Sequence, residues 1–146
     1  MNWQSAIEQT LRTTTANIAR FGDKFPIVSK GTGKYDLEDH VSWTEGFWSG
    51  ILWLSYEYNS NPIFRDAAVK TVASLKRRLE EHRHLDHHDI GFLYSLSAKA
   101  QWILEKDENA KKLALQAADV LMRRWRENAQ LFQAWGPEGD PHNGGR

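Results

Sequence analysis

The sequence predicts an all-α protein built from helical hairpins, and three observations support this prediction. Five helical segments can be recognised along the chain. They alternate between amphipathic segments and segments that are apolar on nearly every side, which is typical of outer and inner helices. A weak repeat places Gly46-Phe47 and Gly91-Phe92 at the entry to the two strongly apolar segments, 45 residues apart. That spacing fits one helical hairpin per repeat, in a solenoid or a closed α/α toroid.

The first three segments establish the alternation. Residues 3–21 gather their apolar side chains along one stripe and should form an outer helix. Residues 45–58 are apolar nearly all round and should form an inner helix. The third segment opens at Pro62, which suits a first helical turn, and continues to Leu79 as an outer helix. Its basic side chains are expected on the polar side, at Lys70, Lys76, Arg77 and Arg78.

The last two segments repeat the pattern. Residues 88–105 return to the strongly apolar kind and predict a second inner helix. Residues 109–128 are amphipathic, with Arg123 and Arg124 expected on the outward side. The long irregular stretches, 22–44 and 129–146, have the length of functional or disordered loops.

The composition fits one globular domain that binds a small molecule. Apolar residues make up 40% and charged residues 26% of the 146 residues. Lys+Arg and Asp+Glu both total 19 without a block of like charge, so neither nucleic acid nor a membrane is an expected partner. The chain has no cysteine, and its start lacks the apolar core of a signal peptide. We therefore expect a cytoplasmic protein without a cofactor.

The most informative stretch is Asp86-His87-His88-Asp89-Ile90-Gly91-Phe92, which sets two carboxylates and two imidazoles before an inner helix. In a structural interpretation, Asp86 caps the helix and Asp89 is the acidic residue three positions later. A metal site is a second interpretation, although adjacent histidines on a helix point in different directions. A catalytic or binding site is the third. The residue spacing alone leaves all three open.

Three motifs together resemble the unsaturated glucuronyl hydrolases of glycoside hydrolase family 88. They are Trp43-Thr44-Glu45-Gly46-Phe47-Trp48-Ser49-Gly50, the stretch 86–92, and Gln133-Ala134-Trp135-Gly136 with Asn143-Gly144-Gly145-Arg146. The resemblance extends along essentially the whole chain. It implies the N-terminal part, about five helices, of an (α/α)6 barrel. Residues 1–146 would then be an incomplete α/α-barrel catalytic domain.

The resemblance also implies a reaction and a site. Family members act on the 4,5-unsaturated uronic acid that polysaccharide lyases leave at the non-reducing end, by hydration of its C4=C5 double bond. Asp89 corresponds to one of two essential aspartates, and Trp43 and Trp135 to tryptophans that flank the sugar. His88 is either a further substrate contact or a structural histidine. The resemblance predicts neither a metal nor a cofactor.

Alternatives remain for the function. An unsaturated rhamnogalacturonyl hydrolase would share the fold and the chemistry. A carbohydrate-binding module would use the tryptophans, of which the chain has seven, without needing the acidic cluster. A helical-repeat scaffold would place its exposed aromatic residues along one concave stripe.

The first testable prediction is that residues 1–146 alone do not hydrolyse unsaturated uronides. In the family, the aspartate that serves as general acid/base follows the Gly-Gly-Arg motif, and we expect it beyond Arg146. Loss of an acid/base removes about 10²–10⁴-fold of rate. The measurement is the decay of ultraviolet absorbance from the conjugated double bond, with a full-length hydrolase as control. Comparable turnover by the 146 residues would mean that Asp89 or Asp86 is the acid.

Overall fold

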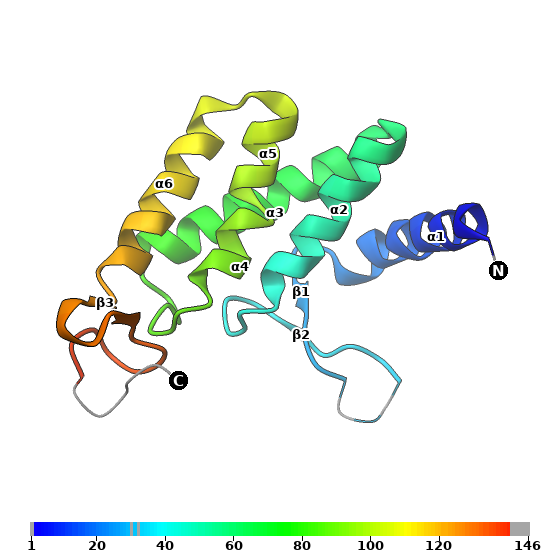
Figure 1. The fold of residues 1–146 in the computed structure, drawn as a ribbon. Coiled ribbons are helices and arrows are strands. Elements are labelled where there is room, and N and C mark those ends of the chain that lie inside the picture. The colour runs from blue at the N-terminus through cyan, green and yellow to red at the C-terminus, as the bar shows by residue number, and fades with distance from the viewer. Residues whose placement is uncertain (1, 30, 32, 141–146) are drawn as a thin grey trace.

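The computed structural model describes residues 2–29, 31 and 33–140 and is mainly α-helical, as predicted. The helices are α1 (Trp3–Phe21), α2 (Glu45–Asn59), α3 (Pro62–Glu80), α4 (Ile90–Ser95), α5 (Ala98–Glu105) and α6 (Glu108–Met122). Two antiparallel pairs of short strands accompany them: β1 (Phe25–Pro26) with β2 (Leu37–Glu38), and β3 (Trp125–Arg126) with β4 (Leu131–Phe132), around the 3-10 helix η1 (Glu127–Ala129). Both strand pairs lie near the end of the molecule where α2 and α4 begin (Figure 1).

Local sequence explains where several helices start. The side chain of Asn2 accepts a hydrogen bond from the Ser5 amide at the start of α1. Asn61 does the same for Ile63, with Pro62 in the first turn of α3. Asp107 accepts from two amides at the start of α6.

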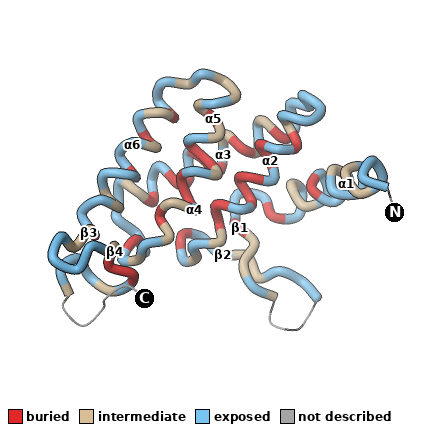
Figure 2. The backbone as a smooth tube through the Cα atoms, viewed as in Figure 1, coloured by how far each residue is buried: buried red, intermediate tan, exposed pale blue. Residues whose placement is uncertain are grey.

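The helices pack as inner and outer layers, with the buried positions concentrated where α2, α3 and α4 meet (Figure 2). Buried residues make up eight of the 15 in α2 and three of the six in α4. The corresponding numbers are seven of 19 in α3 and three of 15 in α6, so α2 is the most buried of these three helices, as predicted. The second predicted inner segment, 88–105, has six buried residues of 18, because α5 adds only two buried residues of eight. It is therefore more buried than α6 but not more buried than α3, and that part of the prediction was wrong. Among the described residues, no helix has the length and apolar character needed to cross a membrane.

The inner helices also expose apolar side chains. Large apolar residues are exposed along one side of α2 and on α4 and α5, at Phe47, Ile51, Leu54, Tyr58, Phe92 and Ile103. On α2 these residues recur at intervals of three or four positions and therefore share one face of the helix.

The predicted segment 88–105 is divided into α4 and α5 at Ser97. The buried hydroxyl of Ser97 donates a hydrogen bond of 2.5 Å to the carbonyl of Leu93, one turn earlier. This use of an i−4 carbonyl by a serine side chain bends helices. The last predicted helix differs as well: α6 ends at Met122, and the chain then enters the β3–β4 pair.

At their starts, α2 and α4 touch through backbone atoms. A Cβ added to Gly46 would lie 2.0 Å from the carbonyl oxygen of Phe92, and one added to Gly50 would lie 3.3 Å from Cβ of Leu96. A Cβ at Gly91 would meet nothing within 4 Å. The two glycines of the sequence repeat are therefore not equivalent, since only Gly46 is required by a close approach.

The second testable prediction compares alanine at these two glycines. Gly46→Ala should lower the free energy of unfolding by about 1–3 kcal/mol, because α2 and α4 must separate to admit the methyl group. Gly91→Ala should be neutral or stabilising by up to about 1 kcal/mol, because alanine favours the helix. Urea unfolding of both variants measures the difference. Equal effects would contradict the backbone contact.

Candidate active site

The start of α2 brings Trp43 next to the first turn of α4. The ring centroid of Phe92 lies 5.4 Å from that of Trp43 and 5.7 Å from that of Phe47. Phe92 lies one turn after Asp89, and its amide donates to the Asp89 carbonyl oxygen. Trp43 is 40% exposed. The sequence-predicted Trp43 and Asp89 thus lie on neighbouring helix starts.

A different contact places Trp135 beside the same segment. The amide of His88 donates to the carbonyl of Ala134 at 2.8 Å, and His87 and Trp135 form an antiparallel bridge. The His88 ring lies 5.4 Å from the Trp135 ring. Trp135 is 50% exposed, in contrast to the core residues Trp48 and Trp53. The described part of the chain therefore brings Trp135 and His88 together at the start of α4.

The carboxylate of Asp89 is not used as a helix cap. Asp89 precedes α4, but its side chain makes no hydrogen bond to the helix amides. Its Oδ1 lies 3.4 Å from Nε2 of His88, and the side chain is 14% exposed. The side chain of Asp86 is half exposed and lies 3.7 Å from His82. The structural interpretation, in which Asp86 caps the helix and Asp89 is the acidic residue three positions later, is therefore wrong, because α4 begins only after Asp89.

His87 is held as a neutral ring. Its Nδ1 accepts a hydrogen bond of 3.1 Å from the Asp89 amide, so that nitrogen carries no proton. The proton is then on Nε2, which lies 2.9 Å from the His84 carbonyl oxygen and donates to it. Burial lowers the pKa of His87, which also favours the neutral form. The 4.0 Å contact of Nδ1 with the Asp89 carboxylate is consequently not an ion pair.

A fully buried ion pair joins the two segments that carry Trp43 and Asp89. Nη1 of Arg78 donates to Oε2 of Glu45 at 2.8 Å and to the Ser42 carbonyl at 2.8 Å. The same guanidinium donates from Nε to the Arg83 carbonyl at 3.0 Å and from Nη2 to the His84 carbonyl at 2.8 Å. Both charged side chains have no exposed surface.

The second carboxylate oxygen of Glu45 completes this arrangement. Oε1 accepts from the amides of Val41 and Ser42, at 2.9 and 3.1 Å. Arg78 was expected on the polar outside of α3, and this expectation was wrong. The guanidinium can be buried because the loops on either side present carbonyl oxygens to it and the first residue of α2 presents a carboxylate.

A second buried arginine supports the Trp135 segment. Nε of Arg124 donates to the Gln133 carbonyl at 2.9 Å, and Nη2 donates to the Gly136 carbonyl at 3.0 Å. The amide nitrogen of the Gln133 side chain donates to the carbonyls of Trp135 and Pro137. Arg124 was also expected to face outward, but it is buried.

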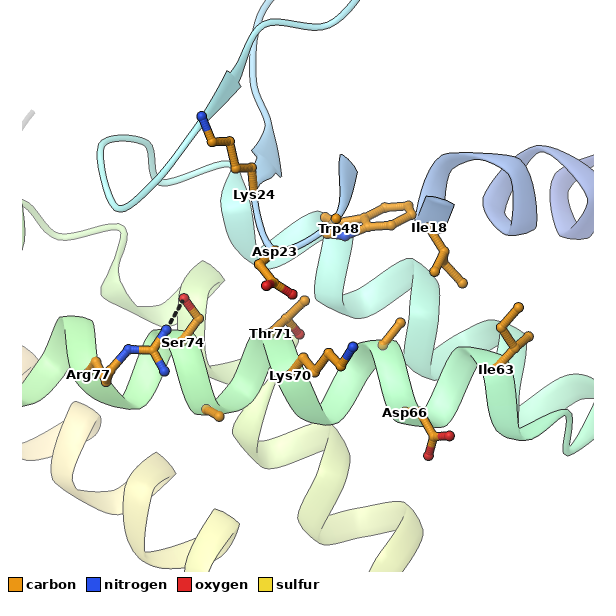
Figure 3. A pocket seen from close by; sticks show the side chains of 13 residues that line it. Ile18, Asp23, Lys24, Trp48, Ile63, Asp66, Lys70, Thr71, Ser74 and Arg77 are labelled. Atoms are coloured by element: carbon orange, nitrogen blue, oxygen red, sulfur yellow. Dashed lines mark hydrogen bonds between the residues drawn. The ribbon is translucent and has the colours of Figure 1, made fainter. Parts of the chain in front are cut away.

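Among the described residues, these side chains form no metal centre, and the cavity between α1, α2 and α3 lies elsewhere. Within residues 2–29, 31 and 33–140, no three His, Asp or Glu side chains are grouped to hold a metal ion. The cavity of about 500 Å³ shown in Figure 3 lies between the end of α1, α2 and α3, and Trp48, Lys70 and Arg77 help to line it. None of the four predicted site residues lines that cavity.

Sequence reasoning missed Glu45, Arg78 and His87 as determinants of this site. Glu45 and His87 stand inside motifs that were singled out, which is the signal that could have marked them. Arg78 lies in a basic run and gives no such signal. The remaining residues of the third motif, Asn143 to Arg146, lie outside the described residues.

Comparison with known proteins gives a consistent result. The sequence matches Glycosyl Hydrolase Family 88 over residues 17–137. It is 65% identical over 144 residues to the unsaturated glucuronyl hydrolase of Bacillus sp. (strain GL1), which covers 99% of this chain and 38% of that protein. It is 40% identical to the unsaturated chondroitin disaccharide hydrolase of Streptococcus agalactiae serotype III (strain NEM316), over 93% of this chain and 34% of that protein.

Solved structures agree with the sequence comparison. The crystal structure of the Bacillus sp. GL1 enzyme, described as responsible for glycosaminoglycan degradation, superposes with a TM-score of 0.94 at 64% identity, covering 99% of this chain and 38% of that chain. An Asp-to-Asn mutant of the Streptococcus agalactiae enzyme complexed with dGlcA-GalNAc6S gives a TM-score of 0.80 at 39% identity, covering 84% and 32%. The chain therefore has the fold of a part of these helical-barrel enzymes, and it spans between 32% and 38% of their length.

The third testable prediction concerns the buried ion pair. Glu45→Gln should lower the free energy of unfolding by about 3–5 kcal/mol, because it leaves the Arg78 guanidinium buried without its counter-charge. Lys76→Gln removes the exposed pair with Glu80, whose charged atoms lie 3.6 Å apart, and should cost at most about 0.5 kcal/mol. Urea unfolding measures both. A Glu45→Gln variant as stable as Lys76→Gln would contradict the role given to the pair.

Proposed function

Because this chain belongs to glycosyl hydrolase family 88, we propose that it forms part of the active site of an unsaturated glucuronyl hydrolase. The substrate is an unsaturated uronic-acid oligosaccharide of the kind that polysaccharide lyases release. Asp89 is the catalytic residue of this part of the chain, and Trp43, His88 and Trp135 contact the sugar. The cytoplasm is the proposed compartment, since the absence of cysteine fits a reducing environment.

One observation carries this proposal. A mostly buried carboxylate, free of helix-capping hydrogen bonds, lies between two segments that each expose a tryptophan. A carboxylate accepts hydrogen bonds from sugar hydroxyls, and aromatic faces pack against flat apolar faces of a sugar ring. A fold that needed the tryptophans only for its core would bury them, as it buries Trp48 and Trp53.

The chemistry requires two carboxyl groups with different tasks. Protonation at C4 and addition of water at C5 convert the enol ether to a hemiketal, which opens and releases the neighbouring sugar. The general acid/base must hold a proton and then accept one from water. Asp89 serves as its ionised neighbour, which favours the protonated form of the acid and orients the sugar. Nε2 of His88 lies 3.4 Å from the Asp89 carboxylate, so both side chains are close enough to contact the same sugar.

The names of the relatives favour glucuronyl over rhamnogalacturonyl substrates. One relative is an unsaturated glucuronyl hydrolase, another acts on unsaturated chondroitin disaccharides, and a relative has been solved with dGlcA-GalNAc6S. We therefore propose an unsaturated disaccharide derived from a glycosaminoglycan as the first substrate to test. A purely carbohydrate-binding role is disfavoured because the similar proteins are hydrolases.

The fourth testable prediction uses a full-length protein. The 146 residues are joined to the remainder of their own reading frame, or replace the matching segment of the Bacillus sp. GL1 enzyme, to which they are 65% identical. Asp89→Asn should reduce turnover by about 10²–10³-fold, because the carboxylate charge is lost at the reacting sugar. Absorbance decay with an unsaturated chondroitin disaccharide measures the rate.

The matched control is Asp86→Asn, the same isosteric change three residues earlier. The half-exposed side chain of Asp86 contacts only His82 among the ion pairs described, so its replacement should leave turnover unchanged. Equal loss in both variants, or full activity of Asp89→Asn, would refute the site assignment.

A further inference from the structure

We infer that His87 is a positioning residue for Asp89, acting through its ring nitrogen on the Asp89 backbone. The inference rests on the proposed function, since it matters only if Asp89 acts on the substrate. His87 itself faces the interior, with 12% of its side chain exposed.

A continuous line of hydrogen bonds connects the buried ion pair to Asp89. Arg78 and His87 both donate to the carbonyl oxygen of His84, at 2.8 and 2.9 Å. The other nitrogen of the His87 ring accepts from the Asp89 amide at 3.1 Å. The carbonyl of His84 is in turn fixed by a guanidinium that is anchored on Glu45. Arg78 and His87 are thus each held by hydrogen bonds to groups other than Asp89.

This arrangement matters because Asp89 lacks the usual restraint. An acidic residue at a helix start is normally oriented by its own hydrogen bonds to the first amides, and Asp89 makes none. The Asp89 carbonyl is held by the Phe92 amide, so the orientation of its backbone also depends on the group that accepts from its own amide. His87 provides that group, and it also pairs with Trp135 through the antiparallel bridge.

The hydrogen bonds exclude His87 as a proton donor or acceptor in the reaction. Both ring nitrogens are engaged by the protein backbone, one as donor and one as acceptor. A displacement of about 1 Å in a catalytic group can cost about 10²-fold in rate, so loss of the acceptor should be seen in kcat.

Two substitutions separate the hydrogen bond from the ring. Asparagine at position 87 removes the ring but keeps an acceptor, because asparagine side chains bond the amide two residues later. Phenylalanine keeps the ring that lies 6.3 Å from the Trp135 ring, but it removes the acceptor. In the full-length protein or the Bacillus chimera, His87→Phe should lower kcat by about 10- to 100-fold with KM changed less than about threefold. His87→Asn should stay within about threefold of the parent.

His82→Asn is the control, because His82 lies in the same connection between α3 and α4 with its side chain half exposed, and its replacement should not affect kcat. The melting temperature of each variant is measured to check that the variant is folded at the assay temperature. A pH–rate profile of His87→Asn with the same shape as the parent's is expected, and loss of one limb would overturn the inference. Equal losses of kcat in His87→Asn and His87→Phe would also overturn the inference, and so would full activity of His87→Phe.

A second measurement does not depend on the variants. The ¹⁵N shifts of the His87 imidazole in the parent should report a neutral ring protonated at Nε2, and a charged ring or the other tautomer would overturn the inference. Asp89→Asn distinguishes the two levels of the proposal. If that variant is inactive and His87→Phe is fully active, only the positioning role fails. If Asp89→Asn is active, the proposed function fails first.

Discussion

The buried pair of Glu45 and Arg78 is the interaction on which the rest of this site depends. Two charges removed from water are stabilising only when nearly every hydrogen-bonding position is used. Here the carboxylate accepts from two loop amides, and the guanidinium donates to three loop carbonyls besides the carboxylate. One side chain of α3 is therefore hydrogen-bonded both to the loop between β2 and α2 and to the loop before α4.

The Trp135 segment follows the same physical rule. Irregular backbone has no ladder of hydrogen bonds, yet its buried carbonyls must find donors. Arg124 donates two of these hydrogen bonds, and the side-chain amide nitrogen of Gln133 donates two more. A planar guanidinium suits this task because its donors point in fixed, divergent directions. Buried arginines thus organise all three segments that carry the predicted site residues.

The fold was largely predictable from periodicity, because helices repeat their burial every three to four residues and α1, α2 and α3 begin close to where the pattern begins. Periodicity could not predict the break at Ser97, which depends on one buried hydroxyl. The pattern also placed Arg78 and Arg124 on the solvent side, because it treats every charged residue as polar. It contains no information on which carbonyls a distant loop will present to them. The site residues came from a resemblance of motifs. What positions Asp89 came only from the structure, since Glu45 and Arg78 are separated by 33 residues.

The contact of Gly46 with the Phe92 carbonyl has a consequence for how the site tolerates sequence change. Where two helices are spaced by side chains, each core substitution resets their distance by the volume it adds or removes. At Gly46 the spacing is set by main-chain atoms, which are the same in every sequence. Substitutions of the apolar side chains farther along α2 should therefore rotate α2 and α4 relative to each other about the Gly46 contact. Their distant ends would move, and Trp43 and Asp89 would keep their separation.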